Sequence, residues 1–447
     1  MPYLRVTKTI LIREMPLGTY LFVPYGFQLE SFFPVIEIDE ATKEVLKLCN
    51  GTRTQDEISQ QFADESGEPV EEVAEALSGL VEYMVREGVL EWSEEPSHIE
   101  PIYNRDRPLS ISMDITSACN LQCPFCSANA GAQRSDDLTL DDIIPLVEQL
   151  RILKPTPFAI SGGEPLLKKD ILLYMVKALS PIKEMAVTVF TNGTLITKDY
   201  AQQLYDAGLR VARVSVDGHT ERLHDTVRGK GTFKRTIQGI HYLRELGIHV
   251  NTVSVISRIN YPYINEIRHF VAHLSDTYNM VPVIPVGRGS DTDLLLNPRE
   301  MFTVKATPMG PGKIQTGITP RNRCNAGETI YIASNGDIFP CLYLNSPGFK
   351  VGNIRDTGLC EIYENGIMQD ILKLTINDLD DCASCDIRYY CGGGCRGLAH
   401  SLCGSLYAPD PTNCEQNKML IHKILENGEE NTKRLLQELL KSTKELG

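Results

Sequence analysis

The chain has 447 residues, of which 42% are hydrophobic, and carries 58 acidic against 44 basic side chains, a formal charge of -14. At about 150 residues per domain, this length favours two or three domains that each bury a core. The acidic balance argues against general nucleic-acid binding, and no apolar run approaches the roughly 18 to 20 residues of a membrane span. The first residues also lack the pattern of a secretory signal, so we expect a cytoplasmic protein.

Charge and cysteine are both distributed unevenly along the chain. Residues 1–100 hold 7 Lys and Arg against 20 Asp and Glu, a net charge of -13, which leaves -1 for the other 347 residues. Of the 13 cysteines, one is Cys49, three lie within 119–126 and nine lie within 324–414. In a reducing compartment, closely spaced cysteines are more often metal or cluster ligands than disulfides.

These shifts in composition predict the domain boundaries. Stretches near 94–108 and 286–298 are polar or rich in Pro and Gly, which is typical of linkers. The expected domains are residues 1–95, 105–300 and 315–425, followed by a C-terminal helix over 426–447.

The first domain is expected to be a small winged-helix-like α+β domain. Residues 3–38 alternate between apolar and polar side chains, which predicts short strands. Amphipathic helices, joined by turns, are predicted over 41–50, 54–65 and 71–88, where apolar residues recur every three or four positions. Cys49 lies on the apolar face of the first helix, and we interpret it as a core residue, because free cysteine is commonly buried.

The middle domain is expected to be a partial (β/α)6 TIM-like barrel. Helical patterns alternate with six short apolar runs, each typical of a buried parallel strand. These runs cover residues 109–115, 157–161, 186–190, 211–216, 250–256 and 281–286. In such a fold the active site forms at the carboxyl ends of the strands.

Three cysteines follow the first of these strands, namely Cys119, Cys123 and Cys126. Three thiolates can hold three irons of a cubane and leave the fourth iron open. Zinc is the alternative, but a closed zinc site needs a fourth ligand, and none follows before His219. The triplet resembles the signature of the radical S-adenosylmethionine (SAM) superfamily. That resemblance implies a 4Fe-4S cluster that binds SAM and cleaves it to a 5'-deoxyadenosyl radical.

Later strand ends are similar to the SAM-binding motifs of that superfamily, in the same order. The resemblance implies SAM contacts from Phe125, Gly162, Gly163, Glu164, Thr191, Asn192, Ser215, Asp217 and Arg228. Taken singly, each of these motifs is also compatible with an ordinary loop turn. Arg228 is equally compatible with a surface ion pair.

A second cysteine group lies in the third domain. It comprises Cys324, Cys341, Cys382, Cys385, Cys391, Cys395 and Cys414, with a predicted hairpin through Asn335 and Gly336. The spacing resembles the SPASM domain, which implies two auxiliary 4Fe-4S clusters. The family pattern assigns Cys382, Cys385, Cys391 and Cys414 to one cluster and Cys324, Cys341 and Cys395 to the other. A zinc ribbon is the alternative, but a single zinc ion would leave three of these seven cysteines unexplained.

The eighth cluster position is open on the sequence alone. Cys360 or Cys403 could fill it; otherwise the cluster of Cys324, Cys341 and Cys395 keeps an iron that could bind a substrate thiolate.

The first domain resembles the peptide chaperone of pyrroloquinoline quinone biosynthesis, a recognition element for ribosomally made, modified peptides. In that family the leader peptide adds as a strand to a sheet edge. A DNA-binding winged helix is the alternative, which the net charge of -13 opposes. The acidic surface could steer a basic leader, or it could serve solvation alone.

Together these patterns predict a radical SAM oxidoreductase that acts as a peptide maturase, forming a thioether or carbon-carbon cross-link in a precursor peptide. The expected partners are that peptide, bound through its leader, and an electron donor such as flavodoxin or ferredoxin, with no nucleic acid. Two alternatives are maturation of a small-molecule cofactor or haem-like intermediate, and a redox-sensing regulator in which clusters gate the winged helix.

Overall fold

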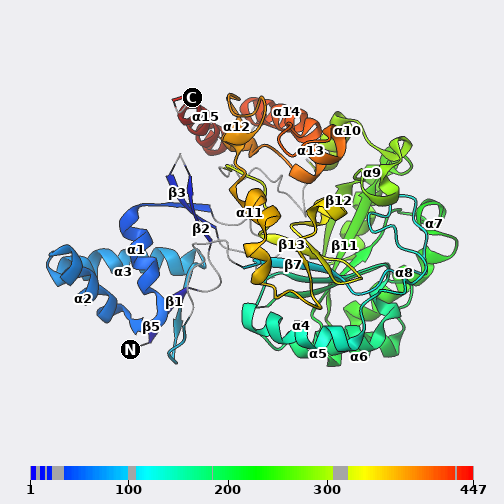
Figure 1. Ribbon diagram of the computed structural model, residues 1–447, viewed down its shortest axis with the longest axis horizontal. Coiled ribbons are helices and arrows are strands. Elements are labelled where there is room, and N and C mark those ends of the chain that lie inside the picture. The colour runs from blue at the N-terminus through cyan, green and yellow to red at the C-terminus, as the bar shows by residue number, and fades with distance from the viewer. Residues whose placement is uncertain are drawn as a thin grey trace. The chain divides into compact units, whose positions relative to one another are not determined.

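The computed structural model describes residues 2–6, 11–15, 18–22, 35–98, 107–183, 185–305, 321–427 and 430–445 (Figure 1). The chain divides into two compact units, Met1–Arg105 and Asp106–Glu445, each described by itself below. No helix in the described part of the chain is both long enough and apolar enough to cross a membrane.

The N-terminal unit contains two small antiparallel sheets and three helices. One sheet has the order β5-β1-β6 and the other the order β2-β3-β4. The strands are β1 (Tyr3–Val6), β2 (Leu11–Met15), β3 (Gly18–Phe22), β4 (Val35–Ile38), β5 (Asn50–Thr54) and β6 (Leu90–Ser93). The helices are α1 (Glu40–Leu48), α2 (Gln55–Ser66) and α3 (Val70–Arg86). The predicted helices are confirmed, but β5 occupies residues for which the sequence predicts a turn.

Helix caps and an apolar core explain why these elements form. The Asp39 side chain accepts from the Thr42 backbone N–H at 2.8 Å and caps the start of α1. Thr54 forms a reciprocal capping box with Glu57 at the start of α2, so backbone N–H groups in the first turn of each helix have a partner. Cys49 is fully buried in the core of this unit, as predicted. Burial raises the pKa of Cys49 to about 12, which keeps its thiol neutral.

Six parallel strands form the centre of the second unit, and each neighbours the next along the chain. They are β7 (Ser110–Asp114), β8 (Phe158–Ser161), β9 (Val187–Thr191), β10 (Val211–Ser215), β11 (His249–Ile256) and β12 (Thr277–Pro282). The intervening helices are α4 (Leu140–Leu153), α5 (Lys169–Leu179), α6 (Lys198–Asp206), α7 (Glu221–Arg228), α8 (Thr232–Glu245) and α9 (Ile264–Leu274). Helices α4, α5 and α6 lie side by side along the sheet (Figure 1). This is the expected α/β architecture of a partial TIM-like barrel.

The last parallel strand begins earlier than the sequence predicts. It spans Thr277–Pro282 rather than 281–286, with Tyr278 and Met280 buried and Val281 40% exposed. Pro282 and Pro285 lack the backbone N–H that a continuing ladder requires, so the strand ends at the first of them.

The predicted hairpin through Asn335 and Gly336 is confirmed, formed by β13 (Thr329–Ile332) and β14 (Asp337–Phe339). Strand β13 also pairs in parallel with β7, and β15 (Gly352–Asn353) pairs with β14, so the sheet grows to nine strands. Helices complete this unit, namely α10 (Pro298–Lys305), α11 (Gly366–Lys373), α12 (Arg388–Cys391), α13 (Arg396–Cys403), α14 (Pro411–Asn427) and α15 (Glu430–Glu445).

A buried polar contact reinforces the junction between β7 and β13. The Tyr331 hydroxyl donates to Asp114 Oδ2 at 2.7 Å, and Asp114 is only 7% exposed. Burial raises the pKa of Asp114 to about 6, although hydrogen bonds from Tyr331 and Ser161 oppose the shift. The folded protein therefore holds the Asp114 proton more tightly than an unfolded chain does.

This raised pKa predicts a pH-dependent stability. As pH rises from 4 through 6, Asp114 loses its proton more readily in the unfolded chain than in the folded protein. The free energy of unfolding therefore falls by about 3 kcal/mol for a shift of about two pKa units. The Asp114→Asn variant lacks this loss. Its melting temperature relative to wild type should therefore increase between pH 4 and pH 7 in differential scanning fluorimetry. The exposed Asp370→Asn variant is the control, and a flat profile for Asp114→Asn would contradict the assignment.

Candidate functional site

The cysteine loop after β7 carries Cys119, Cys123 and Cys126 in an apolar setting. Cys123 and Phe125 are buried and pack with Val227, while Cys119 and Cys126 lie against the same cluster. Burial raises the pKa of Cys119 to about 11, and the charges of Glu164, Cys123 and Cys126 raise it further. The three thiols are thus close enough to interact electrostatically, as ligands of one cluster must be.

The donor set of this loop consists of three thiols in apolar surroundings. In the described ranges, no three Cys, His, Asp or Glu side chains converge closely enough to hold one metal ion. A cubane binds each thiolate to a different iron, so its ligands need not converge on one point. Three neighbouring thiols in an apolar pocket fit that requirement.

Arg288 holds the cysteine loop from the far side of the barrel. Its Nε donates to the Cys123 carbonyl at 2.9 Å and its Nη1 to the Ala130 carbonyl at 2.8 Å, while its backbone N–H bonds to the Cys126 carbonyl. Gly287 precedes it with φ of +60°, and a Cβ there would lie 2.4 Å from the Ser127 carbonyl oxygen. Arg288 lies in the stretch 286–298, for which the sequence predicts a linker, so its role is not predicted. The Gly-Arg-Gly run after the last strand is the available signal.

Removing the Arg288 side chain should loosen the cysteine loop. Arg288→Leu loses two partly buried hydrogen bonds to backbone carbonyls, each worth about 1 kcal/mol. The Cys123 carbonyl keeps the Cys126 N–H as a donor, whereas the Ala130 carbonyl loses its side-chain partner. We expect faster iodoacetamide labelling of Cys123 in the metal-free protein, followed by mass spectrometry, and less iron at this loop after reconstitution. The exposed Arg299→Leu variant should behave as wild type. Equal labelling rates in both variants would show that Arg288 does not order the loop.

Two glycines let the loop after β8 lie directly against the cysteine loop. Gly163 N–H donates to the Thr116 carbonyl at 2.7 Å, and Glu164 N–H donates to the Ala118 carbonyl at 2.8 Å. A Cβ on Gly163 would lie 2.1 Å from the Ala118 carbonyl oxygen. Gly162 has φ of +147°, and its Cβ would lie 2.7 Å from the Thr116 carbonyl oxygen. Both positions therefore require glycine for backbone contact alone.

Glu164 connects the loops after β8 and β9. Its carboxylate is 1% exposed and accepts from Thr191 Oγ1 at 2.7 Å, Asn192 N–H at 2.8 Å and Leu166 N–H at 3.2 Å. Burial raises the pKa of Glu164 to about 7, despite these donors. A carboxylate offers about four lone-pair sites, so one acceptor position is left for a ligand.

Asn120 extends this network into the cysteine loop. It accepts from Asn192 Nδ2 at 3.0 Å and donates to Thr194 Oγ1 at 2.9 Å. Asn120 lies between the predicted ligands Cys119 and Cys123, and the sequence pattern predicts no role for it. The structure therefore brings the predicted residues of three loops together.

Asp217 and Arg228 form a buried ion pair beside Phe125. Arg228 Nε lies 2.5 Å from Asp217 Oδ2, and their side chains are 10% and 0% exposed, so the alternative of a surface pair is wrong. The guanidinium also lies 5.6 Å from the centre of the Phe125 ring. Asp217 Oδ1 accepts from the Val255 N–H, which fixes the pair to β11. Ser215, the last residue of β10, is half-buried two positions before Asp217.

Interactions within the second cysteine group connect Cys324 with Cys395 and Cys341, and Cys382 with three other cysteines. Hydrogen bonding from the Cys395 thiol lowers the pKa of Cys324. Burial raises the pKa of Cys341, and the charge of Cys324 raises it further. In the other set, burial raises the pKa of Cys382 to about 11, and the charges of its partners raise it further; these partners are Cys385, Cys391 and Cys414.

Cys360 and Cys403 differ from these seven in their exposure. Both are exposed, whereas the seven are half-buried. The Cys403 thiol contacts the Pro409 carbonyl at 3.9 Å.

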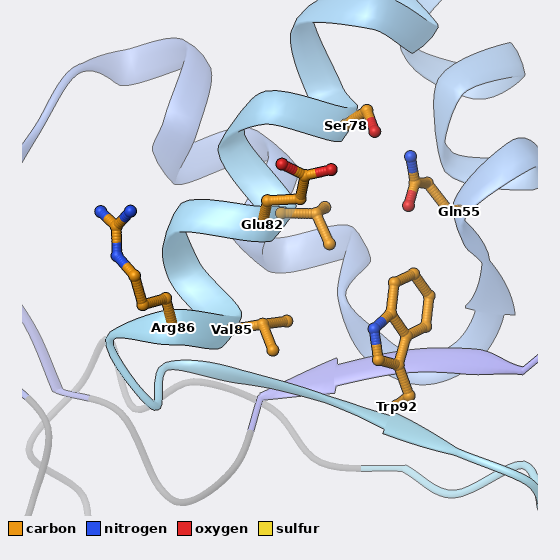
Figure 2. A pocket seen from close by; sticks show the side chains of 7 residues that line it. Gln55, Ser78, Glu82, Val85, Arg86 and Trp92 are labelled. Atoms are coloured by element: carbon orange, nitrogen blue, oxygen red, sulfur yellow. The ribbon is translucent and has the colours of Figure 1, made fainter.

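A separate cavity of about 430 Å³ lies within the N-terminal unit. Figure 2 shows the Trp92 ring projecting from β6 toward Gln55, with Ser78, Glu82 and Val85 presented by α3. Trp92 is 44% exposed, an unusual setting for so large an apolar ring. The cavity thus combines apolar walls with polar groups at its margin.

Comparison with known families defines the class of protein. Residues 113–271 match the model of the radical SAM superfamily, and residues 324–386 match the SPASM iron-sulfur cluster-binding domain. The chain therefore contains a radical SAM domain and a SPASM domain, whose cofactors are SAM and 4Fe-4S clusters.

Individual relatives span several activities. The AdoMet-dependent heme synthase of Methanosarcina barkeri is 26% identical over 339 residues, which is 68% of this chain and 95% of that protein. The mycofactocin maturase MftC of Mycobacterium tuberculosis is 24% identical over 329 residues, covering 68% and 83% of the two chains.

Two solved structures share the fold over most of their length. Streptococcus suis SuiB bound to precursor peptide SuiA has a TM-score of 0.62 at 18% identity, covering 92% of this chain and 99% of that one. The enzyme anSMEcpe with bound AdoMet has a TM-score of 0.60 at 18% identity, covering 74% of this chain and 100% of that one.

Proposed function

We propose that this enzyme modifies a ribosomally made precursor peptide by installing a thioether or carbon-carbon cross-link. The observation that carries the proposal is the presence in one chain of a radical SAM domain, a SPASM domain and an N-terminal unit with a cavity beside Trp92. When bound, the cluster and SAM supply the 5'-deoxyadenosyl radical that abstracts a hydrogen atom from the substrate.

The chain's own residues bind and orient SAM in this proposal. Cys119, Cys123 and Cys126 hold the cluster, and the remaining acceptor position of Glu164 receives the SAM ammonium. Arg228 attracts the SAM carboxylate. Phe125 supplies an apolar wall that excludes water.

The other predicted contacts fall into two groups. The Gly162-Gly163 backbone shapes the methionine side of the site. Thr191 and Asn192 would contact the ribose, and Ser215 and Asp217 are further proposed members of the SAM site.

The seven SPASM cysteines would hold two auxiliary clusters in the two sets already described. The exposure of Cys360 and Cys403 supports a near cluster with one open iron, available to a substrate thiolate. An electron donor such as flavodoxin or ferredoxin would supply reducing equivalents. We place the reaction in the cytoplasm, where thiols stay reduced until they bind iron.

The N-terminal unit would recognise the leader of the peptide. We propose domains at 1–95 for recognition, 105–300 for the radical barrel and 315–425 for the auxiliary clusters, with 426–447 as a terminal helical segment. The net charge of -13 over residues 1–100 favours a basic leader. The similar SuiB structure bound to precursor peptide SuiA supports a peptide substrate.

A second candidate is maturation of a small-molecule cofactor or haem-like intermediate. The similarity to the AdoMet-dependent heme synthase favours it, with 68% of this chain covered. That activity gives no role to the cavity beside Trp92, so we prefer the peptide.

The principal test uses the reconstituted enzyme with SAM, a reductant and the short peptide encoded beside its gene. We expect formation of 5'-deoxyadenosine together with loss of two hydrogens from the peptide, measured by mass spectrometry. Cys123→Ala should abolish both. Formation of 5'-deoxyadenosine with an unaltered peptide and an altered haem-like intermediate would favour the second candidate.

Leader binding can be read directly from Trp92, because it is the only tryptophan in the chain. Titration with the leader should shift its fluorescence emission as solvent leaves the ring. Ser78→Arg places a long side chain in the cavity and should weaken binding about tenfold, or about 1.4 kcal/mol. Gln60→Arg adds the same charge at an exposed position of α2 and should bind as wild type. Equal affinities for the two variants would place the leader elsewhere.

A further inference from the structure

Two asparagine side chains on α14 are directed at one cysteine of the second set. Asn417 Nδ2 lies 3.2 Å from Cys391 Sγ, and Asn413 Nδ2 lies 3.5 Å from the same sulfur. The two residues are four positions apart, so they share a face of the helix. Cys414, another member of this set, lies on the same helix.

The start of α14 is fixed tightly relative to the cysteine loop. Asp410, 2% exposed, accepts from the backbone N–H groups of Thr412 and Asn413 through Oδ1, at 3.1 Å each. Its Oδ2 accepts from the Cys395 N–H at 3.0 Å. A Cβ on Gly394 would lie 2.7 Å from the Asp410 Cβ, so the helix start and this loop are in close contact. These contacts fix the position of the helix segment that carries the Asn413 and Asn417 side chains.

An amide donor has a defined effect on a ligand sulfur. The NH₂ group of asparagine can only donate, and a metal-bound thiolate can only accept, so the contact remains favourable when Cys391 binds iron. Hydrogen bonds to cluster sulfurs withdraw negative charge, which stabilises the reduced state and raises the reduction potential. Cys119 and Cys126, by contrast, accept from the backbone N–H groups of Leu121 and Ala130.

We propose that Asn413 and Asn417 are positioning residues that raise the reduction potential of the auxiliary cluster ligated by Cys391. The inference rests on the proposed function for its ligand assignment. The comparison is between this cluster with and without the two amides, because the cysteines of the other set accept hydrogen bonds from backbone N–H groups of their own. The two amides would thus make the cluster of Cys391 easier to reduce than its ligand cysteines alone would make it.

The test is a mediated redox titration of the reconstituted enzyme, followed by electron paramagnetic resonance. Asn417→Leu should lower the potential of one auxiliary cluster, and Asn413→Leu with Asn417→Leu should lower it further. The other auxiliary cluster and the iron content should not change. Thr412→Val, a neutral change on the same turn, should leave every potential as in wild type. Unchanged potentials in both asparagine variants with full iron content would overturn the inference.

Two further measurements keep the outcome decisive. If the leucine variants lose iron, wild-type enzyme labelled with ¹⁵N-asparagine should show a nitrogen coupling to the reduced cluster; its absence would overturn the proposal. Cys391→Ala tests the ligand assignment separately. Full iron retention in Cys391→Ala would refute that part of the proposed function, whereas iron loss there with unmoved potentials in the asparagine variants would refute the inference alone.

Discussion

The parallel pairing of β13 with β7 is the contact on which both cysteine groups of the second unit depend. Strand β7 leads directly into the loop of Cys119, Cys123 and Cys126, while β13 and β14 lead into Cys341. A barrel that stopped at β7 would expose a full row of backbone donors and acceptors on that strand. The hairpin satisfies them, and the buried contact of Tyr331 with Asp114 adds side-chain specificity to the register.

Backbone contact, more than side-chain chemistry, organises the carboxyl ends of the strands. Gly162 and Gly163 allow two loops to share hydrogen bonds at distances that a Cβ would forbid. Glu164 then links the loop after β8 to the loop after β9, and Asn120 links the latter back to the cysteine loop. The glycines of this motif are thus explained by packing before any ligand is considered.

Local patterns in the sequence predict most of this architecture, and contacts between distant segments account for what they miss. Short apolar runs predict the first five parallel strands, and Asn335-Gly336 predicts the hairpin, whereas the sixth strand begins four residues before its predicted position. The pairing of β13 with β7 joins residues more than 200 positions apart, such as Ile330 and Ile111, so no local pattern reveals it. The role of Arg288 is likewise not predictable from a local pattern, because its partners Cys123 and Ala130 lie more than 150 positions earlier in the chain.

Asp410 has a consequence for how the iron centres assemble. One carboxylate caps the helix that carries Cys414 and also receives the N–H of Cys395, and these cysteines belong to different sets. Ordering either set fixes Asp410 and so lowers the conformational entropy that remains to be lost by the other. Asp410 therefore couples the helix of Cys414 to the loop of Cys395, so a centre that ordered one of these segments would also order part of the other.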